Sequence, residues 1–433
     1  IRGAAGGAAS RAAPARAGTL AALALLLGGC GQDNTGDTAA TQPSVGLDLF
    51  LVFPNPQLQD DGTLQVAAQE YADAYYAAID PSNARLSLAA LMALNQFNSG
   101  TGTQHLVVFR DTHDLGSGRR MTGRRNTDGT LAFVVENYRV DAGTGPYTAI
   151  NVEAAAVRDT RWLFGINAIE FSPLAGAPTA NCGNCVVKFY NYDPATSQRQ
   201  SLVDLDTRGG KAMPTICITC HGGRGDPLKA DDSFPRSVTS LTDVGNTQAR
   251  LQAFNVPSFD YSSRAGFTRA EQEAKFRDFN QWVLCSYPMR SWETGYGAGI
   301  NACRPDANPN EWYAKSAADM IKIWYGGVED GTAALGPALT GAYVPADWAG
   351  RESLWNDVVG KYCRACHLLR GTINQGDIAF SAFTGGFEGY KSRIKAHVFD
   401  RGNMPLSLFV YQNFWGDSAA VGALADFLED GTT

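Results

Sequence analysis

The order of apolar and polar positions divides the chain into an N-terminal segment with strand signals and a C-terminal segment without them. Apolar residues at helical spacing predict a helix over residues 64–79, which ends before Asp80 and Pro81. Runs rich in Val, Ile, Phe and Tyr, separated by Gly, Asn and Asp turns, then predict strands over residues 105–109, 130–135, 161–171 and 186–192. This pattern predicts an α+β domain built around a twisted sheet over residues 46–207.

Helical periodicity replaces the strand signals after residue 207. Helices are expected over residues 269–284 and 312–325, and then over residues from about 351, over 389–397 and over 417–428. The fold class expected for the whole chain is therefore α+β: a mixed sheet and helix domain, followed by mainly α-helical domains over 208–345 and 346–433.

The first residues have the pattern of an export signal. Three arginines precede an apolar run over residues 20–27, which is far shorter than the roughly 20 residues that span a bilayer. Leu27 to Cys30 resembles a bacterial lipobox, in which the cysteine becomes the lipidated first residue. We therefore expect a signal peptide over 1–29 and a polar lipid-anchored tether over 30–45. The alternative is an ordinary signal peptide in which Cys30 is incidental.

Composition and charge narrow the class of protein and its partners. Hydrophobic residues make up 44% and charged residues 18%, as in a soluble globular protein. Removing residues 1–29 takes away three arginines and no acids, so the net charge falls from −7 to −10, with 33 basic against 43 acidic residues. Such a surface argues against nucleic acid and suits a basic or neutral redox protein partner. The expected location is the periplasmic side of a bacterial membrane, and Gly31 resembles outer-membrane rather than inner-membrane sorting.

Two Cys-x-x-Cys-His motifs carry the chemistry. Their cysteines are Cys217, Cys220, Cys363 and Cys366, and their histidines are His221 and His367. Two thiols at this spacing can add to the two vinyl groups of haem, while the next residue presents its imidazole to the iron. Two chance matches are improbable, so the sequence predicts two covalently bound haem c groups. The alternative is a redox-active or disulfide pair with an incidental histidine.

The last ~90 residues resemble a class I cytochrome c domain in the order of their elements. The resemblance implies that Met404, 37 residues after His367 in a loop between helices, supplies a thioether as sixth ligand. His and Met ligation raises the reduction potential and leaves no open site on the iron. His397 is the alternative: it could be the ligand, bond a propionate, contact the other haem or face solvent.

The sixth ligand of the first haem is left open by the sequence. Met121 lies in an arginine-rich stretch over residues 116–125, which is expected to be a flexible loop that could bring a thioether to the iron and guanidiniums to the propionates. His105 and His113 share one strand face by alternation and are further candidates. A vacant or water-bound position is the remaining alternative, and it would allow catalysis at this haem.

Four further cysteines lie outside the haem motifs and the lipobox. In an oxidising compartment, the simplest pairing is one disulfide between Cys182 and Cys185 and another between Cys285 and Cys303. A four-cysteine zinc site is the alternative, which the spacing of the first pair permits.

Two functions are consistent with these residues. The first is extracytoplasmic electron transfer by a membrane-anchored dihaem cytochrome c, which would be a carrier and not an enzyme. The second follows from a resemblance to the bacterial dihaem peroxidases, which pair an N-terminal catalytic haem with a C-terminal electron-donating haem. The 146 residues between His221 and His367 suit that plan, although the chain departs from it in its long strand-containing segment. A dihaem oxygenase is a variant of this second reading.

Overall fold

The computed structural model describes residues 68–140, 147, 151–179, 182–206, 208–223, 225, 228, 234, 244–287, 315–329, 334–369 and 380–429. The α-helices are α1 (Ala68–Ile79), α2 (Leu88–Leu94), α3 (Val152–Val157), α4 (Thr215–His221), α5 (Arg269–Ser286), α6 (Lys315–Trp324), α7 (Glu352–Leu354), α8 (Arg364–His367), α9 (Lys391–Lys395), α10 (Leu408–Gly416) and α11 (Ser418–Glu429). The strands are β1 (Thr103–Asp111), β2 (Gly118–Arg125), β3 (Leu131–Tyr138), β4 (Leu163–Pro173), β5 (Cys185–Tyr192), β6 (Leu202–Val203), β7 (Lys211–Ala212) and β8 (Phe259–Asp260). Short 3-10 helices are η2 (Thr160–Trp162), η4 (Val256–Ser258), η7 (Ala346–Trp348) and η11 (Glu388–Tyr390), and π-helical segments are η8 (Trp355–Cys363), η10 (Phe383–Phe387) and η12 (Ala396–Asp400).

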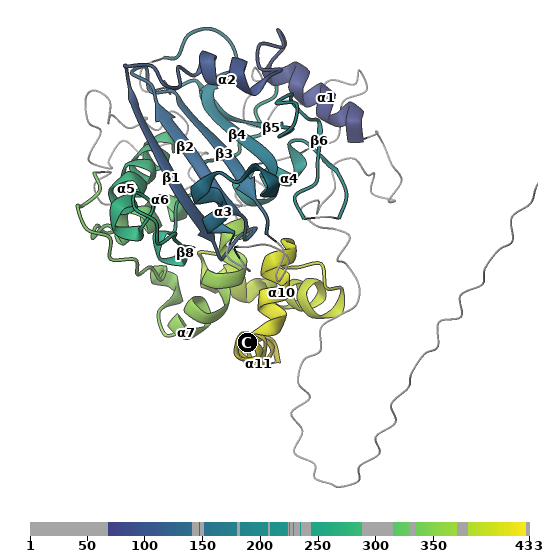
Figure 1. Ribbon diagram of the computed structural model, residues 1–433. Coiled ribbons are helices and arrows are strands. Elements are labelled where there is room, and N and C mark those ends of the chain that lie inside the picture. The colour runs from purple at the N-terminus through teal and green to yellow at the C-terminus, as the bar shows by residue number, and fades with distance from the viewer. Residues whose placement is uncertain are drawn as a thin grey trace, which may run out of the picture. The chain divides into compact units, whose positions relative to one another are not determined.

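A six-stranded antiparallel sheet forms the centre of the N-terminal part (Figure 1). Its strands lie in the order β5-β4-β3-β2-β1-β8, so that β1 to β5 are neighbours largely in chain order. The turn between β2 and β3 shows how local chemistry sets the register. Asp128 Oδ1 accepts a hydrogen bond from the Thr130 amide at 2.9 Å, and Gly129 has the positive φ of 88° that the turn requires. Helices together with this sheet confirm the α+β class.

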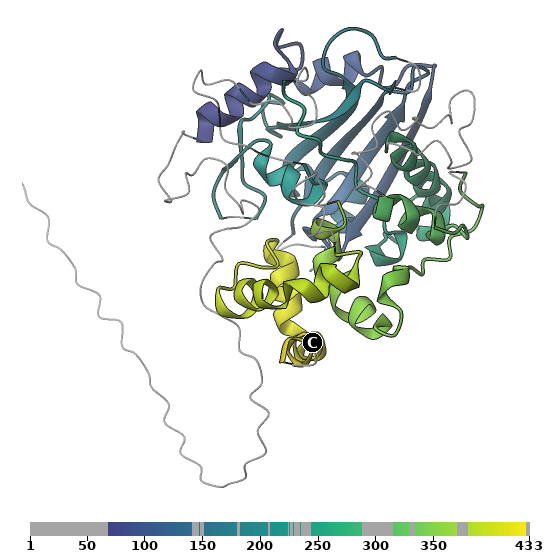
Figure 2. The same cartoon turned by 180° about the vertical axis from the view of Figure 1, so that it is seen from behind.

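The two faces of the sheet have different roles. The register places Met121 opposite Val135, which in turn lies opposite Asn167, so these odd-numbered side chains share one face. Helix α5 packs on this face through Phe279, whose ring lies 5.5 Å from that of Phe133. The other face is covered by α3, whose buried residues form a cluster with Val108 and Tyr138 (Figure 1; Figure 2 shows the sheet from behind). The first face is therefore the one that reaches the Cys-x-x-Cys-His region.

Strand β2 corrects one expectation. Residues 116–125 were expected to form a flexible loop, but Gly118–Arg125 pairs with β1 on one side and β3 on the other. The composition, with two glycines and four arginines, gives a weak strand signal, and pairing with both neighbours overrides it. Gly123 is needed in this place, because a Cβ there would lie 2.4 Å from a ring carbon of Phe279.

Besides the small cluster around α3, two larger hydrophobic clusters divide the described part of the chain. The larger one joins residues of the sheet with residues of α5 and α6, so residues on both sides of position 207 share it. The smaller one lies within the C-terminal residues and is centred on Trp348, Trp355 and Phe387. The helix expected from residue 351 into the second motif is present as α7, η8 and α8 in succession, and α11 matches the expected last helix. Helix α10 was not expected. No helix among the described residues is long and apolar enough to span a bilayer.

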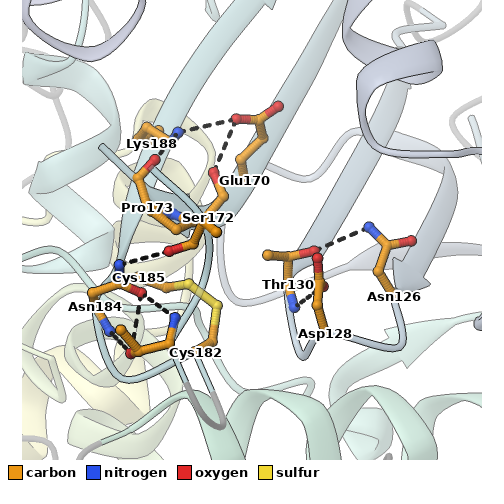
Figure 3. The surroundings of a disulfide bond; sticks show 12 residues. Asn126, Asp128, Thr130, Glu170, Ser172, Pro173, Cys182, Asn184, Cys185 and Lys188 are labelled. Atoms are coloured by element: carbon orange, nitrogen blue, oxygen red, sulfur yellow. Dashed lines mark hydrogen bonds and ion pairs between the residues drawn. A yellow bond between two sulfur atoms is a disulfide. The ribbon is translucent and has the colours of Figure 1, made fainter. Parts of the chain in front are cut away.

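A disulfide joins Cys182 and Cys185 at the start of β5 (Figure 3). Both cysteines are buried. Between them, Asn184 Oδ1 accepts a hydrogen bond from the Thr179 amide at 2.9 Å. The predicted pairing is thus confirmed for this pair, and the zinc alternative is wrong for it. Cys285 is also disulfide-bonded, but its predicted partner Cys303, like Cys30 and the segments 1–29 and 30–45, lies outside the described residues.

A buried ion cluster holds β4 and β5 to the segment that follows α1. The carboxylate of Glu170 is fully buried and lies 2.8 Å from Arg85 Nε and 3.4 Å from Lys188 Nζ (Figure 3 shows Glu170 and Lys188). Burial alone would raise the pKa of Glu170, but the two cations and their hydrogen bonds lower it below its ordinary value. The carboxylate is therefore ionised at neutral pH and compensates two buried positive charges.

Glu170→Gln should destabilise the fold by roughly 3–5 kcal/mol, because it leaves the buried Lys188 without its anion and takes from Arg85 one of its two acid partners, the other being Asp80. Urea denaturation at pH 7 measures the loss. Since the folded pKa of Glu170 lies below its unfolded value, its stabilisation is present above about pH 4.3 and is lost as the pH falls through the folded pKa. The difference between wild type and variant should therefore shrink on acidification. Glu273→Gln removes an exposed pair with Arg269 and should cost less than about 0.5 kcal/mol; equal losses would contradict the assignment.

Candidate functional site

The first motif lies on α4, a helix of less than two turns that begins directly after Pro214. No longer helix leads into it, since β7 ends at Ala212. The helix ends at Gly222, whose φ is 70°. A side chain at Gly222 could not fit, because a Cβ would lie 2.0 Å from the Leu369 carbonyl oxygen, in the residues that follow the second motif.

The second motif lies at the end of the long helical run of η8 and α8. Cys363, Cys366 and His367 of the motif are partly buried, and so is Met404, the predicted sixth ligand. The His367 ring stacks on Phe380 with the ring centroids 4.0 Å apart and the planes 2° from parallel. Phe380 therefore sets the plane of the imidazole.

The two motifs lie against each other although 146 residues separate them in the chain. Cys220 Sγ and Cys366 Sγ are 3.4 Å apart, and none of the four motif cysteines takes part in a disulfide. Gln252 joins the two helices, since its amide nitrogen donates hydrogen bonds to the carbonyl oxygens of both Cys220 and Ala365, the latter at 2.6 Å. One side chain thus bridges the backbones of both motifs.

His221 has the arrangement of a metal ligand. Its Nδ1 lies 2.8 Å from the Arg250 carbonyl oxygen, to which a protonated Nδ1 donates, and this leaves the lone pair of Nε2 for an iron. Burial lowers the pKa of His221 to about 4, so that the imidazole is neutral at physiological pH, as a ligand must be. Phe189 contacts the ring edge-on at 5.0 Å and fixes its orientation.

A cavity opens beside the first motif and is walled by the odd-numbered face of the sheet. We call it the first cavity. It measures about 190 Å³ and is part of about 1300 Å³ of unfilled space when its mouth is counted. Cys217, Cys220 and His221 line it, and so do two of the three sequence candidates for the sixth ligand, Met121 and His113. The sheet therefore brings both candidates to the motif.

The two candidates differ in their surroundings. Met121 is 3% exposed and projects from the middle of the sheet. His113 follows β1, and its buried Nδ1 has no hydrogen-bond partner among the described residues. Burial, together with the nearby Arg364 guanidinium, lowers the pKa of His113 to about 4. Both side chains are thus uncharged at neutral pH and could offer an electron pair to a metal. The Nδ1 atom of His113 has no hydrogen-bond partner among the described residues that would compete for it.

His105 shares the odd-numbered face but does not line the first cavity. Its Nε2 lies 2.8 Å from Asp278 Oδ2, and its ring stacks on Trp282 at 5.6 Å. His105 lies on the strand face that alternation predicts, where helix α5 occupies this part of the face, whereas His113 lies in the turn after β1 ends at Asp111. His105 is therefore engaged in packing and ion pairing.

Of the four arginines on β2, Arg119 lines the first cavity. It pairs with Asp114 at 2.6 Å, and its guanidinium has a pKa above the ordinary value because this acid outweighs the effect of burial. Arg120 points to the opposite face of the sheet, where it lies 5.5 Å from the Phe267 ring. Alternation along β2 puts Arg119 and Arg125 on the cavity side of the sheet, and of these two Arg119 lines the first cavity.

Met404 lies beside His397 in the loop before α10. The amides of Asn403 and Met404 both donate to the His397 carbonyl oxygen, at 3.0 and 3.2 Å, and His397 Nδ1 lies 2.9 Å from Asn403 Oδ1. The thioether of Met404 packs against both of the larger hydrophobic clusters. The loop is thus held in place by its own hydrogen bonds, and Met404 remains the predicted ligand.

Three residues at the site were not singled out from the sequence. Met213 Sδ lies 3.9 Å from Cys217 Sγ, and its position four residues before Cys217, the spacing of one helical turn, was the available signal. Arg364 lies inside the second motif but lines the first cavity. Gln252 has no sequence signal, because a glutamine between two loops is unremarkable until the motifs are seen to meet.

No family model, curated protein or solved structure matches this chain. Among the described residues there is also no cluster of three or more His, Cys, Asp or Glu side chains of the kind that holds a bare metal ion. Any inference about what the two motifs bind therefore rests on their own geometry and chemistry.

Gln252→Leu should destabilise the protein by roughly 1–3 kcal/mol, because two carbonyl oxygens lose their donor at a partly buried contact. The midpoint of urea denaturation measures the effect. Gln69→Leu is the matched control, since its amide bonds only the exposed Asp73, and it should change stability by less than about 0.5 kcal/mol. Equal stability of the two variants would show that the bridge between the motifs does not form.

Proposed function

We propose that the chain binds two haem c groups, one at each Cys-x-x-Cys-His motif. Cys217 and Cys220 would hold the first group by thioether bonds with His221 as iron ligand, and Cys363, Cys366 and His367 would hold the second. The donor set supports this, because no motif cysteine is in a disulfide and the Nδ1 atom of His221 is committed to a carbonyl. The first cavity is smaller than the roughly 300 Å³ of a typical small-molecule site, so the macrocycle would extend into its mouth.

The function that these sites support best is electron transfer. A haem supplies one-electron redox chemistry, and the protein sets its potential through ligands, burial and hydrogen bonds. The observation that carries the proposal is the contact between the motifs, with Cys220 Sγ and Cys366 Sγ 3.4 Å apart. Two attachment points in contact favour passage of electrons between the sites over isolated use of either.

The protein residues around each site have distinct roles in this proposal. Phe380 and Phe189 fix the planes of the two imidazoles, and the Arg250 carbonyl increases the basicity of His221. Met404 would close the second site, which then would exchange electrons and bind nothing else. At the first site either Met121 or His113 would take the same role, which is supported by the position of both side chains in the wall of the first cavity.

An enzyme of the dihaem peroxidase or oxygenase type is the second candidate. One observation favours it: the first cavity contains an unpartnered imidazole nitrogen at His113 together with the charged pair of Arg119 and Asp114. Such groups can move protons or stabilise charge beside a reacting ligand. This function requires that the first iron keep an exchangeable position, which spectroscopy can test.

The cellular setting is a proposal from the sequence alone. The basic and apolar N-terminal pattern and Cys30 support a lipid-anchored protein on the periplasmic side of a bacterial membrane. Attachment of haem to Cys-x-x-Cys-His outside the cytoplasm is consistent with that location. The acidic net charge supports a basic or neutral redox protein as partner.

Replacing the motif cysteines in pairs should remove the haems one at a time. The full chain should carry two haems by pyridine haemochrome assay, while Cys217→Ala with Cys220→Ala, or Cys363→Ala with Cys366→Ala, should each leave one. Cys182→Ala with Cys185→Ala is the matched control, since this pair forms a disulfide, and it should keep both. Two haems in either motif variant, or none in the wild type, would refute the assignment.

Met404→Leu should abolish the Met-to-iron charge-transfer absorption of the second haem, while both haems of the wild type are low-spin. Met92→Leu, a partly buried methionine on α2, should leave the spectrum unchanged. Absorption and electron paramagnetic resonance spectra of the oxidised protein measure both features.

Two other results would redirect the proposal. If the spectrum of Met404→Leu matches that of the wild type, Met404 is not the ligand. If His397→Gln then changes the low-spin spectrum of the second haem, His397 is the sixth ligand. A high-spin ferric haem that binds cyanide, or that reacts with peroxide, would overturn the carrier function and support the enzyme.

A further inference from the structure

A second cavity, separate from the motif cysteines, lies between helix α6, the helical run of η8 and α8, and the segment 255–260. It measures about 430 Å³, within the range of sites that bind small molecules. Four residues line both this second cavity and the first one: His113, Asn255, Phe259 and Arg364. The two cavities therefore adjoin, and His113 and Arg364 are the two titratable groups at their junction.

One wall of the second cavity is aromatic and one is cationic. Trp324, Trp355 and Tyr343 form the aromatic part, and the Tyr343 and Trp355 rings meet edge to face at 5.8 Å. Lys361 and Arg364 supply positive charge one helical turn apart. An apolar body with an anionic head is the ligand chemistry that such walls complement.

Arg364 is the cation best able to bind an anion there. Its Nε donates to the Gly360 carbonyl at 3.2 Å, its Nη1 contacts Met320 Sδ at 3.4 Å, and its guanidinium lies 5.6 Å from the Trp324 ring. Among the described residues no carboxylate lies within ion-pair distance of Arg364, and the acid whose charge acts on it is Asp111 across the first cavity. A largely buried guanidinium held by a carbonyl, a thioether and a ring retains N–H donors for a bidentate anion.

The other charged groups at this cavity are already paired. Lys361 Nζ lies 3.8 Å from Asp417 Oδ2 and is 40% exposed, so solvent and an acid both compete for it. Asp260 pairs with Arg110 at 3.7 Å. The anion-binding capacity is thus concentrated on Arg364, at the end of the cavity nearest the first motif.

We propose that the second cavity binds a small organic carboxylate, with the carboxylate on Arg364 and the apolar body against Tyr343 and Trp355. The bound molecule lies next to His113 and hence beside the first cavity. Binding of the carboxylate does not depend on the proposed function. The further step, that the second cavity is a substrate or effector site for the first haem, rests on the proposed function.

Isothermal titration of the full-length chain, with whatever cofactors it carries, tests the proposal with benzoate as probe and benzamide as its neutral isostere. Benzoate should bind at least 10-fold more tightly than benzamide. Arg364→Gln should lower the benzoate affinity by about 10-fold or more, while Lys361→Gln should lower it less. Arg393→Gln, an exposed arginine over the Tyr390 ring, is the control and should change nothing.

Three outcomes would overturn the proposal: no benzoate binding at millimolar concentration, equal affinity for benzoate and benzamide, or unchanged affinity in Arg364→Gln. Absence of binding together with an altered spectrum of the first haem in Arg364→Gln would show that Arg364 instead holds a carboxylate of the cofactor. Haem content, measured on the same samples, reports separately on the proposed function. Failure of one can therefore be told from failure of the other.

Discussion

The contact between the two short motif helices, α4 and α8, is the constraint on which the site depends. Backbone meets backbone there, because Gly222 has no side chain and the Leu369 carbonyl occupies the place that a Cβ would fill. Gln252 then satisfies one carbonyl from each helix, so that separating the helices would leave both without a donor. Every other feature of the site follows from this contact, including the closeness of Cys220 to Cys366 and the access of Arg364 to the cavity of the other motif.

The sheet is the second requirement, because it supplies a rigid wall with a strict alternation of faces. A shift of one residue in register would turn Met121 away from the first cavity and turn Arg120 toward it. Pairing of β2 with strands on both sides prevents such a shift. Helix α5 fixes the same register, because Phe279 packs against Phe133 and fits closely over Gly123.

Much of this could be predicted from local sequence, and the remainder could not for identifiable reasons. The α+β class, helix α5 and the pairing of Cys182 with Cys185 follow from periodicity and spacing, which are local properties. Strand β2 was wrongly expected to be a loop, because glycine and arginine have low strand propensity and its stability comes from its neighbours. Gln252 and the role of Arg364 depend on a contact across 146 residues, and no local pattern encodes such a contact.

The two motif sites differ in what surrounds them, and this difference bears on function more than their shared chemistry does. The second site is made from helices and a loop that its own hydrogen bonds hold, with Met404 and His397 adjacent. The first site faces a sheet that offers a thioether, an unpartnered imidazole and an ion pair on one wall. The unpartnered ring nitrogen of His113 costs desolvation in the folded protein unless another group binds it. An iron bound by His113 would suit a relay, whereas a ligand in the adjoining second cavity, which Arg364 also lines, would give the first site a role beyond one.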